Sequence, residues 1–128
     1  MESANATKEI TLADYSKEII MHHLSSFHNN DLEEVVSDYI DESVLITPDA
    51  TYTGPEEIRT FFVGLMRYFP KQRSSFELDR LTVNGELAYI VWHAKTPNLN
   101  VPLGSDTFII KGSKIYQQTF VGQLNYLD

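Results

Sequence analysis

The segment Thr82-Val83-Asn84-Gly85-Glu86-Leu87-Ala88 joins two runs of strand-forming residues, 76–83 and 87–95. Asn84-Gly85 is a dipeptide strongly favoured in two-residue hairpin turns, so the two runs are predicted to pair as antiparallel strands. In the first run the apolar positions change parity after Leu78, which indicates a β-bulge. Because a bulge bends the strand that contains it, this segment predicts a curved sheet with a hollow side.

More strands are predicted on the C-terminal side of this hairpin. Residues 105–111 and 114–122 flank Gly112-Ser113 and form a second hairpin, so at least four consecutive antiparallel strands are expected. An earlier strand, Ser43–Thr47, is predicted to end at Pro48.

Three helices are predicted in the N-terminal half. Thr11-Leu12-Ala13-Asp14 has the form of a capping box and begins a long amphipathic helix that ends at Asn29-Asn30. Residues 31–40 form a short second helix and residues 54–69 a third. The apolar stripe of the first helix is Leu12, Ile19, Ile20, Leu24 and Phe27, and that of the second is Val35, Val36, Tyr39 and Ile40. Helices followed by strands predict an α+β protein with segregated elements.

The composition predicts one domain. A chain of 128 residues with 42% hydrophobic residues can bury a single core, and residues 1–10 read as a polar N-terminal tail before a domain at residues 11–128. The sequence contains no cysteine, which excludes disulfides, thiolate metal sites and cysteine nucleophiles. Gly-rich phosphate loops and serine-elbow motifs are also missing, so no cofactor is expected.

Charge and hydropathy narrow the set of partners. The formal net charge is -8, and the ten Lys and Arg residues are scattered, which disfavours nucleic acid and anionic lipid. Residues 1–10 do not resemble a secretory signal, and no apolar run approaches the roughly 18 residues that span a bilayer. We therefore expect a cytoplasmic location without membrane contact. His22-His23 does not predict a metal site, because consecutive helical residues diverge by about 100°.

Asp106 is the most unusual residue, because it is the one carboxylate in the strand Gly104–Ile110. It shares a face with Phe108, and both faces of the strand look covered. A buried carboxyl group resists ionisation, so near pH 7 it could donate a hydrogen bond or a proton to a bound molecule. The alternative is a structural carboxylate that caps backbone amides or pairs with Arg80 or Lys95.

Histidines could complete a site around this acid. If the hairpin centred near Leu99 closes symmetrically, His93 lies opposite Asp106 on the same face, whereas a slip of one residue turns Trp92 inward instead. His23 lies on the buried stripe of the first helix, either as a satisfied core histidine or as a site residue.

The last predicted strand contains two glutamines, one of which could contribute an amide group to the site. One of Gln117 and Gln118 must face the hollow, where it could bond Asp106 or a ligand, or be satisfied at the sheet edge. The simplest interpretation of the Tyr and Phe residues is that they belong to the hydrophobic core rather than to a ligand site.

The chain resembles the nuclear transport factor 2-like superfamily, particularly its SnoaL-like branch, over residues 11–124. The resemblance rests on four phrases in order, namely Asn30–Glu33, Thr53–Ile58, Ala88–Trp92 and Gly104–Phe108. It implies a cone in which three helices pack in the concave face of a curved, mainly antiparallel sheet around an apolar pocket. It also implies a homodimer formed through the outer sheet face.

The superfamily includes isomerases, epoxide hydrolases, dehydratases, polyketide cyclases and non-catalytic binders, so fold alone does not give function. In the isomerase arrangement the protonated aspartate corresponds to Asp106, the tyrosine to His23 and the base to Thr47. Threonine cannot act as that base, so His93 or His23 would have to supply it. The cyclase branch, which relies on an aspartate acid/base, suits these residues better.

The sequence therefore favours an isomerase, cyclase or dehydratase that acts without metal or cofactor on a small, mostly apolar carbonyl compound. The candidate catalytic residues are Asp106, His93 and His23. The candidate ligand-binding residues are Phe27, Tyr39, Thr47, Phe61, Phe62, Trp92, Phe108 and Gln118. A non-catalytic binder and a protein-docking module with a filled pocket are the alternatives, and the latter predicts no cavity above roughly 300 Å³.

Overall fold

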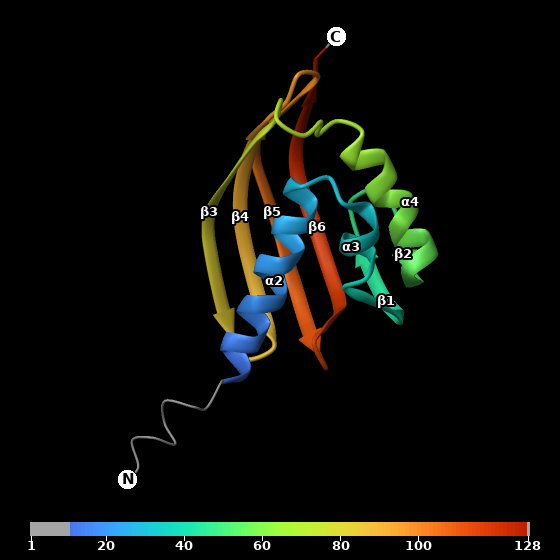
Figure 1. Cartoon of the computed structure of the whole chain (residues 1–128), viewed down its shortest axis with the longest axis vertical. Helices are drawn as coiled ribbons and strands as arrows, with labels where there is room; N and C mark the ends of the chain where they lie inside the picture. Colours follow the sequence, from blue (N-terminus) through green and yellow to red (C-terminus); the bar gives the residue numbers. More distant parts are fainter. Residues whose placement is uncertain (1–10, 128) are drawn as a thin grey trace.

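The computed structural model describes residues 11–127, so the expected tail at residues 1–10 lies outside it. The elements, with the labels of Figure 1, are α2 Leu12–His28, α3 Leu32–Val36, β1 Tyr39–Ile46, β2 Thr51–Thr53, α4 Gly54–Met66, β3 Ser75–Asn84, β4 Leu87–Lys95, β5 Leu99–Lys111 and β6 Lys114–Tyr126. None of the described helices is both long and apolar enough to cross a bilayer.

One sheet organises the molecule. Its six strands have the order β2-β1-β6-β5-β4-β3, and every neighbouring pair is antiparallel except β1 and β6, which run parallel. The three helices pack against one side of this sheet (Figure 1). The prediction of an α+β fold with three helices on a curved, mainly antiparallel sheet is confirmed.

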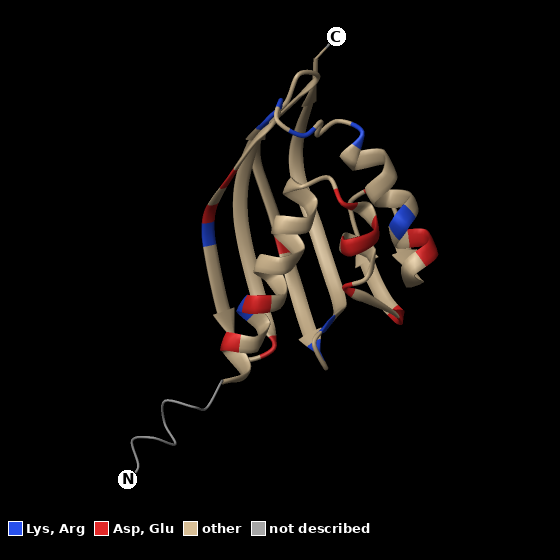
Figure 2. Cartoon of the chain, viewed as in Figure 1, with Lys and Arg blue, Asp and Glu red and all other residues tan. Residues whose placement is uncertain are grey.

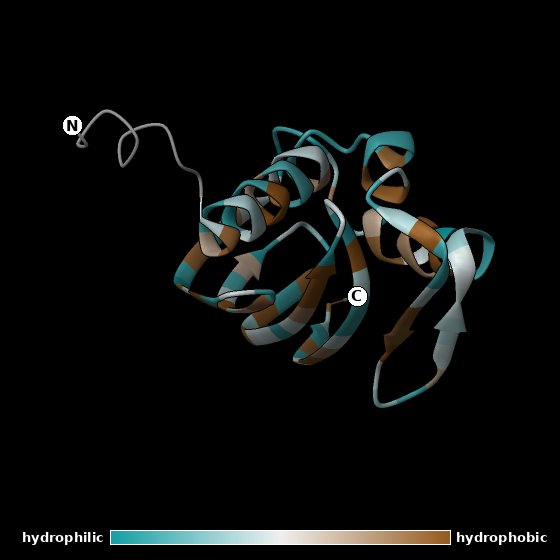
Figure 3. Cartoon of the chain, turned by 90° about the horizontal axis from the view of Figure 1, so that it is seen from below, coloured by the Kyte–Doolittle hydropathy of each residue, from teal (hydrophilic) through white to brown (hydrophobic). Residues whose placement is uncertain are grey.

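The sheet is curved because its long strands are irregular. The predicted bulge is present, since the β3–β4 register shifts between Leu78 and Arg80. A second shift lies between Trp92 and Ala94 in β4, and the strands wrap around the interior when seen from below (Figure 3). This curvature produces the concave face on which the site is built.

Both predicted hairpins form. Lys111 pairs with Lys114, and both turn residues between them have positive φ, as a type I′ turn requires. In the other hairpin Asn84 pairs with Leu87, so the turn is Gly85-Glu86, one residue later than predicted. Gly85, with φ of 61°, is the turn residue that adopts the left-handed backbone.

Helix α2 begins as predicted. The Thr11 side chain accepts from the Asp14 backbone N–H, and the Asp14 side chain accepts from the Thr11 backbone N–H, which confirms the capping box. Leu12 is 55% exposed and therefore does not belong to the buried stripe. Ser16 donates to the Gly85 carbonyl oxygen at 2.7 Å and so fixes α2 against the β3–β4 turn.

The predicted second helix is too long. It ends at Val36, and Tyr39 and Ile40 begin strand β1. The cause is long-range pairing, because Tyr39 lies opposite Ile115 of β6 and the Ile115 N–H donates to the Asp38 carbonyl oxygen. The short strand β2, which pairs with β1, was not predicted from the sequence.

The core lies between the helices and the concave face. It includes Ile20, Val35, Leu45, Ile58, Phe62, Ile90, Leu99, Phe108 and Ile115. Most of the charged residues belong to the helices or lie toward the strand ends (Figure 2). Asp106 of β5, by contrast, is buried.

Candidate functional site

A small cavity lies between the helices and the concave face of the sheet. The space open to the centre of a water molecule is about 40 Å³, enough for roughly three waters. Its lining residues are His23, Leu24, Phe27, Phe61, Phe62, Leu65, Phe76, Ile90, Trp92, Asp106, Phe108, Gln118 and Phe120. The wall is mainly apolar, and one carboxyl group, one imidazole and one amide face the space.

Asp106 is buried on the inner face of β5, where two side chains donate to it. The Trp92 indole N–H reaches Oδ1 at 2.8 Å, and the Gln118 amide reaches Oδ2 at 2.8 Å. Burial raises the pKa of Asp106 from 3.8 to about 6, while the bonds from Trp92 and Gln118 and the nearby His23 oppose the rise. Asp106 is therefore a buried acid that titrates within reach of neutral pH, and its bonds go to neither Arg80 nor Lys95.

Trp92 is held tightly in place. Its indole is stacked between Phe76, at 5.0 Å between ring centroids, and Phe120, at 5.9 Å. It also covers Gly104, where an added Cβ would lie 2.4 Å from the indole ring. A glycine is required at this position because the indole occupies the space of a side chain, and the same indole leaves little empty volume in the cavity.

The predicted pairing of His93 with Asp106 is wrong. Ile90 lies opposite Asp106 and Trp92 opposite Gly104, so His93 is on the outer face. There its Nδ1 lies 2.7 Å from Asp79 Oδ2, in a pair that is about half exposed.

The physical reason for this error is the hairpin geometry. The Thr96 N–H donates to the Leu99 carbonyl oxygen, and Lys95 pairs with Asn100. The turn therefore consists of residues 96–99, and its centre lies before Leu99 rather than at it. The irregularity between Trp92 and Ala94 then shifts the register by one residue, which places Ile90 rather than Tyr89 opposite Asp106. Trp92, the alternative inward residue, therefore faces the cavity.

His23 is buried and lines the cavity. Its Nδ1 lies 3.2 Å from Asp38 Oδ2, and its ring makes edge-on contacts with Tyr39, Phe62 and Phe108. Asp38 was not predicted as a partner of His23. The one sequence signal for it was an acidic residue just after the short second helix. A carboxylate at Nδ1 fixes the orientation of an imidazole, which is the arrangement a general base uses.

Tyr39 and Gln118 connect the two titratable groups. The Tyr39 hydroxyl donates to Gln118 Oε1 at 2.5 Å and lies 3.5 Å from His23 Nε2. Burial raises the pKa of Tyr39 well above its ordinary value, so this hydroxyl keeps its proton. A buried chain of polar contacts therefore runs from Asp38 through His23, Tyr39 and Gln118 to Asp106. Gln118 is the inward-facing member of the glutamine pair, and Gln117 is exposed.

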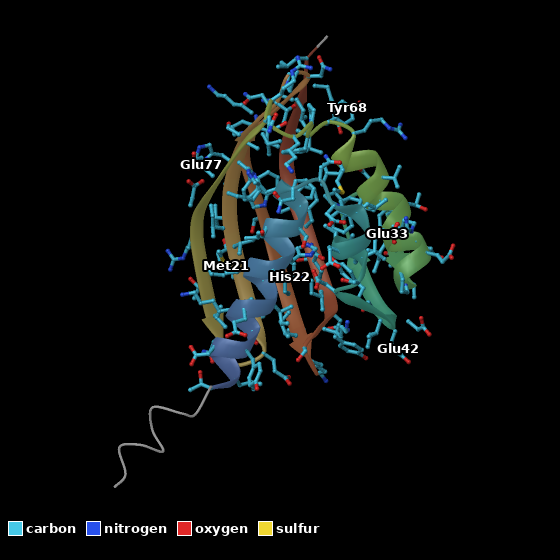
Figure 4. All side chains as sticks on the ribbon, viewed as in Figure 1. Met21, His22, Glu33, Glu42, Tyr68 and Glu77 are labelled. Carbon is cyan, nitrogen blue, oxygen red and sulfur yellow. The ribbon has the colours of Figure 1, made fainter. Side chains whose placement is uncertain are left out.

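The solvent end of this chain is His22, which Figure 4 labels on the α3 side of α2. His22 Nδ1 lies 2.9 Å from Asp38 Oδ1 and Nε2 lies 3.0 Å from Glu34 Oε1. The bond to Glu34 is the largest of the effects that raise the pKa of His22. Across residues 11–127, no cluster of three or more His, Asp or Glu side chains could hold a metal ion.

Most of the expected wall residues line the cavity, but Tyr39 and Thr47 do not. Phe27, Phe61, Phe62 and Phe108 line it, whereas the Thr47 hydroxyl bonds to Ala50 in the turn after β1. The strand ends at Ile46, so the position that would hold the isomerase base points outside the Asp106 cavity.

Thr47 instead lines a second, larger hollow, which we call the lateral groove. The lateral groove lies between α4, the β1–β2 segment and the last half of β6, with a volume of about 510 Å³. It is lined by Thr47, Pro48, Asp49, Tyr52, Thr60, Phe61, Gly64, Leu65, Tyr68, Phe120, Gly122, Leu124 and Tyr126. Phe61, Leu65 and Phe120 line both hollows.

Comparison with known proteins identifies the family of the chain. A family model described as SnoaL-like domain matches residues 21–117. A search of curated proteins found no relative of the chain by sequence.

Solved structures share the fold at low identity. A Kribbella flavida DSM 17836 protein provisionally named a ketosteroid isomerase has a TM-score of 0.74 at 12% identity, over 94% of this chain and 86% of that one. An NTF2-like protein of unknown function from Mesorhizobium loti has a TM-score of 0.74 at 16% identity, over 90% and 96%. An LEH-like epoxide hydrolase from M. tuberculosis has a TM-score of 0.67 at 14% identity, over 87% and 84%. These similarities establish the fold.

Proposed function

We propose that this chain, which belongs to the SnoaL-like domain family, is an acid–base enzyme of the isomerase, cyclase or dehydratase kind. Its substrate is a small, mostly apolar carbonyl compound. The observation that carries the proposal is the buried carboxyl of Asp106, with a pKa of about 6, in the same apolar cavity as the imidazole of His23. Moving a proton on a bound ketone requires a proton donor and a proton acceptor that face the same space, and Asp106 and His23 both line this cavity.

Each residue has a role in the proposed reaction. Protonated Asp106 donates to the carbonyl oxygen, and His23, oriented by Asp38, removes a proton from the adjacent carbon. The product of this step is an enol, and return of the proton to another carbon completes an isomerisation. Trp92 and Gln118 hold the Asp106 carboxyl in place through its two oxygens. The mainly apolar lining of the cavity strengthens these interactions.

Exchange of ketone α-hydrogens in D₂O tests the proposal, because it requires only the first proton transfer. Cyclohexanone and 2-decanone are suitable substrates, followed by proton NMR. Asp106→Asn is expected to slow the exchange by about 100-fold or more, because general acid catalysis contributes on that order. Asp79→Asn, on the outer face of the sheet, is the matched control and is expected to retain the wild-type rate. Equal rates in the two variants would remove Asp106 from the mechanism.

A non-catalytic binder is favoured by Thr47, which stands in place of the isomerase base. A docking module is favoured by the small volume of the Asp106 cavity. About 40 Å³ lies far below the roughly 300 Å³ of typical ligand sites. Native mass spectrometry of the purified protein separates the candidates, since a retained ligand recovered chemically unaltered supports binding. A wild-type protein that exchanges no ketone α-hydrogens would support these non-catalytic candidates.

We also propose that the protein is cytoplasmic and forms a homodimer. Exposed apolar side chains on the outer sheet face, including Ile46, Tyr89 and Val121, support a dimer through that face. Sedimentation of Val121→Glu against wild type tests it, and the variant is expected to be monomeric.

A further inference from the structure

The cavity and the lateral groove differ greatly in size but share a wall. The cavity measures about 40 Å³ and the groove about 510 Å³. The cavity is too small for a ligand larger than a few water molecules unless its lining side chains move, whereas the groove could hold a ligand of ordinary size.

The shared wall consists of three side chains. The Phe61 ring contacts Tyr52, a groove residue, at 5.3 Å and Phe62, a cavity residue, at 5.1 Å. Phe120 lies 6.2 Å from Phe61 and also stacks on Trp92, so it connects the groove to the indole that donates to Asp106. Leu65 completes the wall. These contacts are between side chains, and side chains change rotamer without a change of backbone fold.

Two glycines contribute to the open groove from opposite sides. Gly64 lies inside α4, where glycine costs about 1 kcal/mol relative to alanine, yet a Cβ added there would meet nothing within 4 Å. Gly122 of β6 leaves room for the Phe120 ring, because its Cβ would lie 3.0 Å from that ring. Contact with the Phe120 ring explains why position 122 is a glycine. No such contact requires a glycine at position 64, where the missing side chain leaves the groove open.

The groove lining indicates the chemistry of its ligand. Five residues with hydroxyl groups line it beside the apolar residues, namely Thr47, Tyr52, Thr60, Tyr68 and Tyr126. Asp49 is its one charged residue within the described part of the chain, and the protein carries a net charge of -8. An anion is repelled here, and a neutral or cationic molecule with an apolar body is favoured.

We propose that the lateral groove and the Asp106 cavity are two parts of one ligand site, separated by a gate of Phe61, Leu65 and Phe120. The ligand is a neutral or cationic amphipathic molecule that is too long for the cavity alone. It lies along the groove and passes its carbonyl end through the gate to Asp106. This inference rests on the proposed function for the identity of that end, but the site itself can be tested without turnover.

Trp92 supplies a direct readout, since it is the one tryptophan of the chain and its indole N–H bonds to Asp106. The experiment titrates 2-decanone into ¹⁵N-labelled protein and follows the indole signal. The wild type is expected to show a saturable shift. Absence of any shift at the solubility limit of 2-decanone would contradict the proposal.

Gly64→Phe introduces a large side chain into the groove at a position where an added Cβ meets nothing within 4 Å. Val63→Phe, at an exposed position of the same helix that lies outside the groove, is the matched control. Gly64→Phe is expected to weaken 2-decanone binding by about tenfold or more, which is about 1.4 kcal/mol, with little change for Val63→Phe. Equal affinities of the two variants would remove the groove from the site. Thermal unfolding of both checks that they fold.

Two more measurements complete the test. Decanoate has nearly the same apolar chain with a negative charge, and it is expected to bind at least about tenfold more weakly than 2-decanone. Tighter decanoate binding would overturn the proposed ligand class. A changed sedimentation coefficient for Gly64→Phe alone would assign the groove to contact between copies of the chain and overturn the proposal.

The outcomes separate this inference from the proposed function. If Gly64→Phe weakens binding while Asp106→Asn exchanges ketone hydrogens normally, the two-part site stands and the catalytic role fails. If Asp106→Asn stops the exchange while Gly64→Phe binds 2-decanone normally, the catalytic role stands and the two-part site fails.

Discussion

Asp106 and Asp79 both contact side chains of strand β4, but from opposite faces of the same sheet. Asp106 accepts from Trp92 on the concave face and is 8% exposed. Asp79 pairs with His93, the next residue of β4, on the outer face, where both side chains are 44% exposed. Trp92 and His93 are neighbours in the sequence, yet Trp92 lines the cavity and His93 is half exposed on the outer face.

The difference shows that the face of the strand decides the chemistry. On the concave face, burial raises the pKa of Asp106 to about 6, and two fixed donors hold its oxygens. On the outer face, water screens the Asp79–His93 pair, and such exposed pairs contribute only about 0–1 kcal/mol to stability. A functional acid therefore requires the curved inner surface as well as the carboxyl group.

The largest expected difference is between Trp92→Ala and His93→Ala. Truncation of Trp92 removes a buried ring stacked between Phe76 and Phe120, and it should lower the free energy of unfolding by about 3–5 kcal/mol. His93→Ala should change it by about 1 kcal/mol or less. Urea unfolding of both variants measures the two values. Similar losses would mean that Trp92 does not lie on the inner face.

The next effect is a dependence of stability on pH. Because the folded pKa of Asp106 is raised, the folded protein binds this proton more readily than the unfolded chain does between about pH 4 and pH 6. Its contribution therefore favours folding at pH 4 and is lost as pH rises through 6, by about 3 kcal/mol for a rise from 3.8 to about 6.

Asp106→Asn isolates this contribution, because the variant has no proton to lose there. Relative to wild type, its unfolding free energy should rise by about 2 kcal/mol between pH 4 and pH 7. Urea unfolding at unit steps of pH checks the difference, with Asp79→Asn as the exposed control. A difference that stays constant with pH would show that Asp106 is not desolvated.

A smaller contrast is expected on the last strand. Gln118→Leu leaves the Tyr39 hydroxyl and one Asp106 oxygen without their partner and should cost about 1–3 kcal/mol. Gln117→Leu, on the exposed face of β6, should change stability by about 0.5 kcal/mol or less. If the two substitutions cost the same, the register of β6 would be in doubt.

Local signals predicted much of the fold. The Thr11–Asp14 capping box, the two hairpins and the bulge after Leu78 each depend on a few adjacent residues, and all are present. The burial of Asp106 followed from its strand neighbours. The end of the second helix did not follow, because Tyr39 is in a strand through parallel pairing with a strand more than 70 residues away.

The site was harder to predict than the fold. The β4–β5 register depends on the Thr96–Leu99 turn and on an irregularity after Trp92, and neither has a local sequence signal strong enough to exclude a shift. Asp38 reaches His23 only because the chain turns sharply between α3 and β1. Residues that long-range geometry brings together could not be identified from spacing alone.

The most direct measurement of the central claim is a ¹³C NMR titration of the Asp106 side-chain carboxyl, assigned by comparison with Asp106→Asn. Burial in the cavity predicts that this carboxyl titrates with a pKa of about 6. A pKa of 4 or below would mean that Asp106 is fully ionised at neutral pH and would contradict its role as a proton donor.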